Sequence, residues 1–385
     1  MDFELSEELK MIQSLAREFV EGQLKPLERD LLGRAADLSD ARAYLSPEKE
    51  TALVQTARET GLWGAGIPEE LGGAGLSTLG VCLVEEELTK TIVPFHFGDV
   101  TPILFDCSPE QRGKYLLPII NLEKHPYLAL MEDDVADDLS GMSAKAQKDN
   151  GHYVLNGKKL AFSRRHEDYF ALVFAAAAGG VTCFLVDKDN PGFTVAKNEE
   201  HSGWLAQLRE PLALSFQDCR VPAANILGEE GKAFHLGKKW LPPRRIVRGA
   251  RCVGITSRLL AEASARALAT ESFGQAISGR PGVQAALAEI AMNIHAARLM
   301  VYEAAVTADA GKSVFREAAM VRLFTTRMVR AAADQAAHIF NGPPYVDGVS
   351  VERLCRRALD VSLADIALDA QRHMVANDVL KGLKV

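Results

Sequence analysis

Hydrophobic residues recur every three or four positions over much of the first part of the chain. They do so over residues 6–19, 47–61 and 78–89. This spacing places apolar side chains on one face of a helix and polar side chains on the other, so it predicts three amphipathic helices. A glycine-rich stretch, residues 61–77, separates the last two helices and is expected to form a loop.

The pattern changes in the middle of the chain. Short apolar or alternating runs, HYVLNG, YFALVFAAA, VTCFLVD, GFTVAK and LALSF, are separated there by Gly, Asn, Asp and Pro. Runs of this length with turn residues between them are typical of β-strands. Long helical periods then return over residues 253–271, 282–310, 315–340 and 351–380. They predict four or five helices packed in a bundle.

These changes divide the chain into three predicted domains. We expect a helical domain over residues 1–123, a β domain over 124–228 and a helical bundle over 229–385. A chain of 385 residues can bury more than one hydrophobic core, because single domains usually have about 100–200 residues. The predicted fold class is α+β, mainly α.

Composition excludes several function classes. The net charge of −7 provides no basic field for nucleic acid. No apolar run reaches the roughly 18 residues of a membrane helix, and the polar opening MDFELSEELK is unlike a signal peptide, so we expect a cytoplasmic protein. The six cysteines contain no C-x-x-C pair. They predict buried reduced thiols, and neither a metal site nor a disulfide framework.

Three groups of motifs carry a resemblance to a known family. The first is GIPEELGGAGLS followed by the EEEL helix. The second is HYVLNGKK, FLVDKDNPGF and LSFQDCRVPAANILGEEGKAF. The third is SFGQAISG and VERLCRRALD in the helical tail. In this order and spacing the chain resembles the acyl-CoA dehydrogenase family over essentially its whole length.

The resemblance implies a fold and a reaction. The family fold has an N-terminal helical domain, a middle β-barrel-like domain and a C-terminal four-helix bundle, usually assembled as a dimer of dimers. Its members remove two hydrogens from the α and β carbons of an acyl-CoA thioester. A carboxylate takes the α-proton while FAD accepts a hydride, so a base, a flavin and an oxyanion site are needed.

The family's first flavin-contacting segment is poorly preserved. It reads T-E-P-x-x-G-S-D and matches MEDDVADD, residues 131–138, where Glu132 and Asp138 are kept. Met131, Ala136 and Asp137 replace the threonine, the glycine and the serine. The resemblance makes Glu132 and Asp138 candidate FAD ligands. The alternative is a solvated acidic loop, because so many carboxylates disfavour flavin phosphates.

The second flavin element, G-x-K-x-x-I-T/S, matches Gly157, Lys159, Phe162 and Ser163. The resemblance makes the Ser163 hydroxyl a candidate ligand for the isoalloxazine edge; an ordinary strand-end hydroxyl is the alternative. Ala161 stands where the family often has an aromatic residue that shields the ring. This element is therefore preserved only in part.

In the bundle, the family's R-x-x-F-G motif sends an arginine to the FAD pyrophosphate of a neighbouring subunit. Thr270 occupies the arginine position, and Phe273 is retained. Pro281 stands where a glutamine is expected, and the G-G-x-G-Y turn becomes NGPPY, which keeps Gly342. Phe273 and Gly342 are therefore candidate FAD contacts beside several lost ones.

The family's catalytic glutamate lies in a Y-E-G-T segment at a fixed distance after V-E-R-L-x-R-D-A-R. The same distance from Val351 falls on residues 364–367, where Asp365 is the one carboxylate. The resemblance makes Asp365 the candidate catalytic base. Aspartate is one methylene shorter than glutamate, which disfavours the geometry that proton removal needs.

Some family members carry the base in an earlier L-x-x-E-R segment, which matches residues 241–245. The base position is then Arg244, which cannot accept a proton. Arg245 matches the family arginine and is the second candidate catalytic residue. Arg244, Arg245, Arg248 and Arg251 form a cationic stripe. The stripe either contacts an anion or a partner's carboxylates, or is a structural, surface-paired feature.

Three functions follow from the resemblance. In the first, the chain is the flavin-poor subunit of a heteromeric α2β2 acyl-CoA dehydrogenase for a bulky acyl group, similar to those of bacterial steroid side-chain degradation. FAD is then held mainly by a paralogous partner and is weak or absent in the lone chain. In the second, the chain is a self-sufficient flavoenzyme, as a homo-oligomer, that holds FAD mainly by backbone contacts and uses Asp365 as base. In the third, the fold binds CoA thioesters without redox chemistry.

Overall fold

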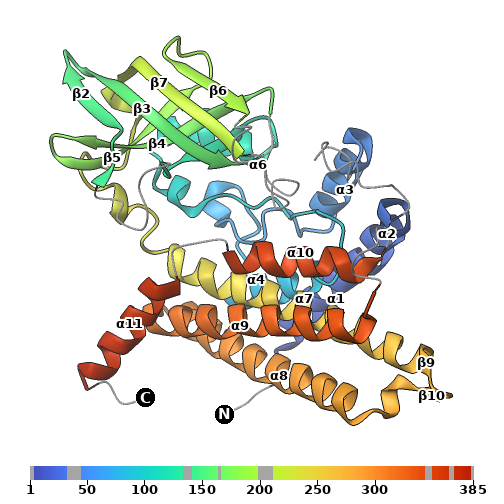
Figure 1. The fold of residues 1–385 in the computed structure, drawn as a ribbon. Helices are drawn as coiled ribbons and strands as arrows, with labels where there is room; N and C mark the ends of the chain where they lie inside the picture. Colours follow the sequence, from blue (N-terminus) through green and yellow to red (C-terminus); the bar gives the residue numbers. More distant parts are fainter. Residues whose placement is uncertain are drawn as a thin grey trace.

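The structure is a computed structural model that describes residues 4–32, 45–132, 141–163, 166–197, 211–342, 349–363 and 368–382. A helical region, a β-sheet and a second helical region follow one another along the chain. Figure 1 shows the sheet at one end of the molecule and the long C-terminal helices at the other, with the N-terminal helices beside them. This is the predicted three-part arrangement.

The N-terminal region confirms the three predicted helices. Its helices are α1 (Glu7–Phe19), α2 (Lys25–Leu32), α3 (Pro47–Glu59), α4 (Thr78–Leu88), α5 (Pro109–Gln111) and α6 (Leu117–Ile120). The hydroxyls of Ser6, Ser46 and Ser77 accept hydrogen bonds from the backbone N–H three residues further on, at 3.3, 3.3 and 3.1 Å. These N-caps fix where the three longest helices begin.

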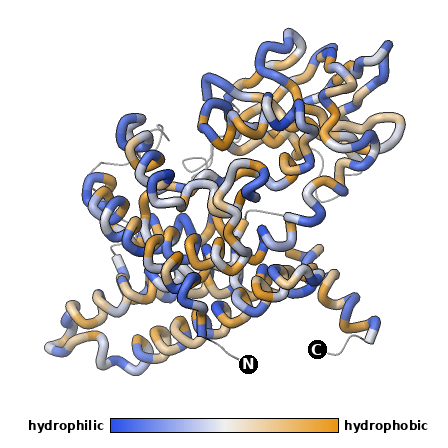
Figure 2. The backbone as a smooth tube through the Cα atoms, turned by 180° about the vertical axis from the view of Figure 1, so that it is seen from behind, coloured by the Kyte–Doolittle hydropathy of each residue, from blue (hydrophilic) through white to orange (hydrophobic). Residues whose placement is uncertain are grey.

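The middle region is one eight-stranded sheet. Its strands are β1 (His125–Ala129), β2 (Lys145–Asp149), β3 (His152–Phe162), β4 (Tyr169–Ala177), β5 (Gly180–Asp187), β6 (Phe193–Lys197), β7 (Pro211–Pro222) and β8 (Ile226–Leu227). The order is β6-β7-β3-β2-β4-β5-β8, and β1 pairs with β4 in parallel. In Figure 2, hydrophobic orange runs through the strands of this region and blue gathers on its loops.

All five runs expected to be strands lie in β3 to β7. The apolar pattern does not predict β1 and β2. Strand β2 reads KAQKD, and its burial pattern shows only Ala146 buried. Strand β1 contains Pro126, and proline disfavours strands because it cannot donate a ladder hydrogen bond. Neither strand therefore has a strong local signal.

Five C-terminal helices are described. They are α7 (Leu241–Ala269), α8 (Pro281–Asp309), α9 (Phe315–Phe340), α10 (Ser350–Leu363) and α11 (Leu368–Leu380), and a small hairpin of β9 (Glu271–Ser272) and β10 (Gln275–Ala276) follows α7. Helix α7 begins ahead of the expected residue 253 because its first turns are rich in arginine, which hides the apolar period. The elements are compatible with the proposed domain boundaries after residues 123 and 228.

Helix α4 lies at the centre of the helical packing. All its residues from Leu79 to Leu88 are buried, and α4 shares a hydrophobic core with α7, α8 and α9. A Cβ atom at Gly254 of α7 would lie 2.1 Å from the Thr89 hydroxyl oxygen. Glycine is therefore required where α7 crosses the end of α4.

Three further observations concern the described part of the chain. No helix in it is both long and apolar enough to cross a membrane. No cluster of three or more His, Cys, Asp or Glu side chains in it is placed to hold a metal ion. The six cysteines are free, and all except the half-buried Cys355 are buried.

Candidate functional site

A small cavity lies between the N-terminal helices and the first turns of α7. Its volume is about 110 Å³. Apolar side chains form most of its wall, among them Ile67, Val81, Phe105, Trp240 and Val247. The rings of Phe105 and Trp240 meet edge to face, with centroids 5.2 Å apart. The wall therefore suits an apolar ligand group.

Charged side chains occupy one part of the cavity wall: Glu85, Asp99 and Arg244. Arg251 binds Glu85 with two hydrogen bonds, from Nε at 2.9 Å and from Nη2 at 3.0 Å. The same Nη2 donates to Asp99 at 2.9 Å, and Arg244 forms an ion pair with Asp99. Two carboxylates from the N-terminal region and two arginines from α7 thus form one network, which we call the cavity charge cluster.

The charge cluster keeps Asp99 ionised. Burial alone would raise the pKa of Asp99, but the guanidinium groups of Arg244 and Arg251 outweigh burial and hold the pKa well below its usual range. The backbone fixes this carboxylate, because Gly98 has a φ of 71° and a Cβ atom there would lie 2.8 Å from the Trp63 ring. Only glycine lets the chain turn here.

The arginine stripe therefore contacts carboxylates of the chain's own N-terminal region through Arg244 and Arg251. Arg245 is buried, with 7% of its surface exposed, and it does not line the cavity. The candidate catalytic base, Asp365, lies outside the described residues. The proposed roles of Arg245 and Asp365 stay predictions.

Glu132, a candidate FAD ligand, is engaged inside the protein. Lys159 Nζ lies 2.7 Å from its carboxylate. The side chain of Lys159 is 0% exposed and that of Glu132 is 5% exposed. The backbone N–H and hydroxyl of Ser143 each donate to Glu132 at 2.7 Å, and the N–H of Ala144 donates at 3.0 Å. The carboxylate thus has a full set of internal donors. Asp138 lies outside the described residues.

The other flavin candidates lie far apart. Ser163 follows the end of β3 and is half-buried. Phe273 lies at the β9–β10 turn with a left-handed φ of 56° and 99% of its surface exposed, and Gly342 is exposed after the end of α9. Figure 1 shows β3 and the β9–β10 hairpin at opposite ends of the molecule. They can meet one flavin only if two chains assemble.

The end of α7 does not supply a complete site for a flavin diphosphate. Thr270 Oγ1 and Arg266 Nε are buried, and neither has a hydrogen-bond partner in the described structure. The Arg266 guanidinium lies 5.7 Å from the Phe340 ring centroid. The Nε–H of Arg266 is thus free to donate to a ligand and the Thr270 hydroxyl is free to donate or accept, but the hydroxyl at the arginine position is uncharged. FAD fits these residues only in part.

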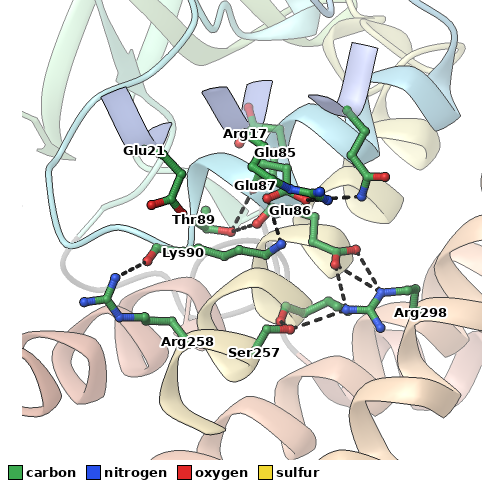
Figure 3. Close-up of polar contacts among 12 residues, drawn as sticks. Arg17, Glu21, Glu85, Glu86, Glu87, Thr89, Lys90, Ser257, Arg258 and Arg298 are labelled. Carbon is green, nitrogen blue, oxygen red and sulfur yellow. Dashed lines mark hydrogen bonds and ion pairs between the residues drawn. The ribbon is translucent and has the colours of Figure 1, made fainter. Parts of the chain in front are cut away.

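The sequence did not identify the partners of the acidic run in α4. Glu85, Glu86 and Glu87 are 7%, 2% and 2% exposed. As Figure 3 shows, Arg298 of α8 lies against Glu86, with a shortest distance of 2.7 Å, and Lys90 lies 2.7 Å from Glu87. The sequence does contain one signal for these ion pairs: three glutamates lie in an otherwise apolar helix, and buried charges need partners.

Comparisons with known proteins agree with this architecture. The N-terminal, middle and C-terminal domains of acyl-CoA dehydrogenase match residues 6–123, 128–215 and 234–380. The chain is 31% identical to the mitochondrial isobutyryl-CoA dehydrogenase of Dictyostelium discoideum, over 97% of this chain and 91% of that protein. The chain belongs to the acyl-CoA dehydrogenase family. It is an oxidoreductase of the CH–CH group of acyl-CoA thioesters.

Further relatives agree with this assignment. The chain is 30% identical to the (R)-benzylsuccinyl-CoA dehydrogenase of Thauera aromatica, over 99% of this chain and 97% of that protein. The structure of butyryl-CoA dehydrogenase from Megasphaera elsdenii superposes with a TM-score of 0.81 at 28% identity, over 99% of this chain and all of that chain. The fold is therefore the acyl-CoA dehydrogenase fold, as the sequence predicted. Family members generally use FAD.

Proposed function

We propose that the chain is the flavin-poor subunit of a heteromeric acyl-CoA dehydrogenase, paired with a paralogous chain that holds FAD. The observation that carries this proposal is Thr270. An uncharged hydroxyl, with its oxygen buried and unpartnered in the described structure, stands where the family motif has an arginine. The motif position itself therefore carries no cation for a diphosphate.

The expected loss of flavin affinity is large. A hydrogen bond to a charged group contributes about 1.5–3 kcal/mol, and about 1.4 kcal/mol corresponds to a factor of ten in affinity. Loss of the arginine alone would weaken FAD binding by about 10- to 100-fold. Glu132 adds to this, because Lys159, Ser143 and Ala144 already occupy its carboxylate.

The exposed surface supports assembly with a second chain. Met292, Leu299 and Val306 of α8 are 66%, 42% and 54% exposed. They are spaced by seven residues, so they form one apolar line, which we call the α8 stripe. Phe273 is almost fully exposed. The Arg280 guanidinium lies 5.9 Å from the centroid of the Phe273 ring. Exposed apolar groups of this kind support a protein interface.

Two other functions remain as alternatives. A homo-oligomeric flavoenzyme that uses Asp365 as base is supported by the full-length similarity to isobutyryl-CoA dehydrogenase, which is named for a dehydrogenation. A CoA-thioester binder without redox chemistry is disfavoured by membership of this family. The colour of the purified protein separates the first two functions.

The cavity favours a short acyl group in this chain. An engineered protein cavity of about 150 Å³ holds one benzene molecule, and the cavity here is smaller, at about 110 Å³. A bulky acyl group such as a steroid side chain would need this cavity to open or would need the partner's site. The bulky-substrate prediction therefore depends on the partner.

The test measures flavin absorbance after gel filtration. The chain expressed alone should be nearly colourless, and co-expression with a paralogous dehydrogenase should give a yellow complex. Thr270→Arg should raise the flavin retained by the lone chain, whereas Thr307→Arg at a half-buried position near the end of α8 is a matched control. Stoichiometric flavin in the unmodified lone chain would instead favour the autonomous enzyme.

A further inference from the structure

Arg244 has hydrogen-bond donors that no residue of the described structure uses. A guanidinium carries five N–H donors. Arg244 engages Asp99 through Nη2, lines the cavity and keeps 27% of its side chain exposed. Arg251, in contrast, donates hydrogen bonds from Nε and Nη2 to Glu85 and Asp99. Arg244 is thus the arginine of the cavity charge cluster that both lines the cavity and has donors left for a ligand.

The acidic members of the cluster are already neutralised. Both carboxylate oxygens of Glu85 accept from Arg251, and Asp99 is paired with Arg244 and Arg251. A cationic ligand group would find no unpaired carboxylate in the cluster. An anionic group with two oxygens matches the planar fork of a guanidinium.

The size and lining of the cavity limit the rest of the ligand. The wall beside Arg244 is apolar, with Val81, Phe105 and Val247 among its members, and the volume is about 110 Å³. Only a few carbon atoms fit between an anionic end and the mouth of such a cavity. A long or branched hydrocarbon would also leave the donors of Arg244 without acceptors, which costs free energy when they are desolvated.

We infer that this cavity receives a short acyl group that ends in a carboxylate, and that Arg244 binds that carboxylate. The substrate class is thus the CoA monothioester of a short dicarboxylic acid. The inference rests on the proposed function in one respect, because it takes an acyl-CoA thioester as the ligand of this chain. Arg244 is a specificity-determining residue and takes no part in proton or hydride transfer.

The experiment compares thioesters of equal carbon number by isothermal titration calorimetry on the full chain. Succinyl-CoA is paired with butyryl-CoA, and glutaryl-CoA with pentanoyl-CoA. Charge-assisted hydrogen bonds of about 1.5–3 kcal/mol correspond to about 10- to 100-fold. The carboxylated member of at least one pair should bind tighter by that factor.

Two variants assign the preference to Arg244. Arg244→Met keeps the apolar stem and removes every donor, so both members of a pair should bind equally. Arg244→Lys keeps the ion pair with Asp99 and loses the planar fork, so it should retain a reduced preference for the carboxylated thioester. Because it preserves the charge, it also controls for a folding defect in Arg244→Met. Arg220→Met, which removes a surface partner of Asp149 in the middle region, should leave the preference unchanged.

Each result decides the inference. Equal affinity for both members of each pair, a preference that survives in Arg244→Met, or no binding of any thioester would overturn it. Flavin content measured on the same protein reports the proposed function separately. A lone chain that holds stoichiometric flavin yet prefers the carboxylated thioester would refute the flavin-poor role and leave the inference standing.

Discussion

The ammonium group of Lys159 lies 2.7 Å from the carboxylate of Glu132, inside the middle region. Both residues occupy positions that resemble flavin-contacting motifs of the family. In this chain they bind each other, and Ser143 and Ala144 complete the hydrogen bonds of Glu132. These contacts therefore give both motif residues a structural role, and the flavin contact proposed for Glu132 stays a prediction.

Breaking this pair should destabilise the protein strongly. Lys159→Met leaves the Glu132 charge buried without its cation, and removal of one partner of a buried pair costs about 3–5 kcal/mol. The double variant Glu132→Gln, Lys159→Met should recover part of that loss. Urea unfolding followed by circular dichroism measures the free energies. Lys158→Met, at an exposed neighbouring position, is the control, and an equal effect of both lysine variants would contradict the explanation.

The pair also predicts an acid-dependent loss of stability. Burial alone would raise the pKa of Glu132, but hydrogen bonds from Lys159, Ser143 and Ala144 outweigh burial and lower it from 4.5 to about 2. Because the folded pKa lies below the unfolded one, this contribution is present above pH 4.5 and is lost as the pH falls through about 2.

Thermal unfolding between pH 2 and pH 5 tests this window. Glu132→Gln should be less stable than the parent protein at pH 5, and the difference should shrink toward pH 2. Burial lowers the pKa of Lys159, and the interaction with Glu132 opposes that shift. A difference that stays constant from pH 5 to pH 2 would refute the role assigned to Glu132.

The contact of α4 with α7 at Gly254 should tolerate no side chain. A Cβ atom there would lie 2.1 Å from Thr89 Oγ1 and 2.2 Å from the Glu86 carbonyl oxygen, so Gly254→Ala must push the two helices apart. Overpacking of this kind costs about 1–3 kcal/mol. Gly282→Ala in α8 meets no atom within 4 Å and should be neutral. A melting temperature unchanged by Gly254→Ala would show that the helices can separate freely.

The sequence predicted the parts of the fold that local patterns control. Residues 169–177 read as a strand because nearly every side chain in that run is apolar, and β4 has those bounds. Strand β2 escaped prediction because its residues are mostly polar and exposed, and its pairing with β3 is what orders it. Family resemblance supplied the order of the three regions.

The cavity charge cluster was beyond prediction for a related reason. The stripe of arginines was visible at its helical spacing, but its partners Glu85 and Asp99 come from segments more than a hundred residues away, with a separation of 152 residues between Asp99 and Arg251. Asp99 is a single carboxylate in an apolar segment. The packing of α4 against α7 determines which charged side chains meet. No local sequence pattern predicts that packing.

The α8 stripe predicts that one substitution will weaken assembly without unfolding the chain. Leu299 is 42% exposed, so it contributes little to the core, and a glutamate there would bring a charge into an apolar interface. Leu299→Glu should therefore shift the protein toward smaller species in light scattering after gel filtration, with a nearly unchanged melting temperature. Met11→Glu, at a 67% exposed position of α1, should leave the molar mass unchanged. If Leu299→Glu keeps the parent's molar mass at low micromolar concentration, the interface lies elsewhere, because a buried uncompensated carboxylate at its centre costs several kcal/mol.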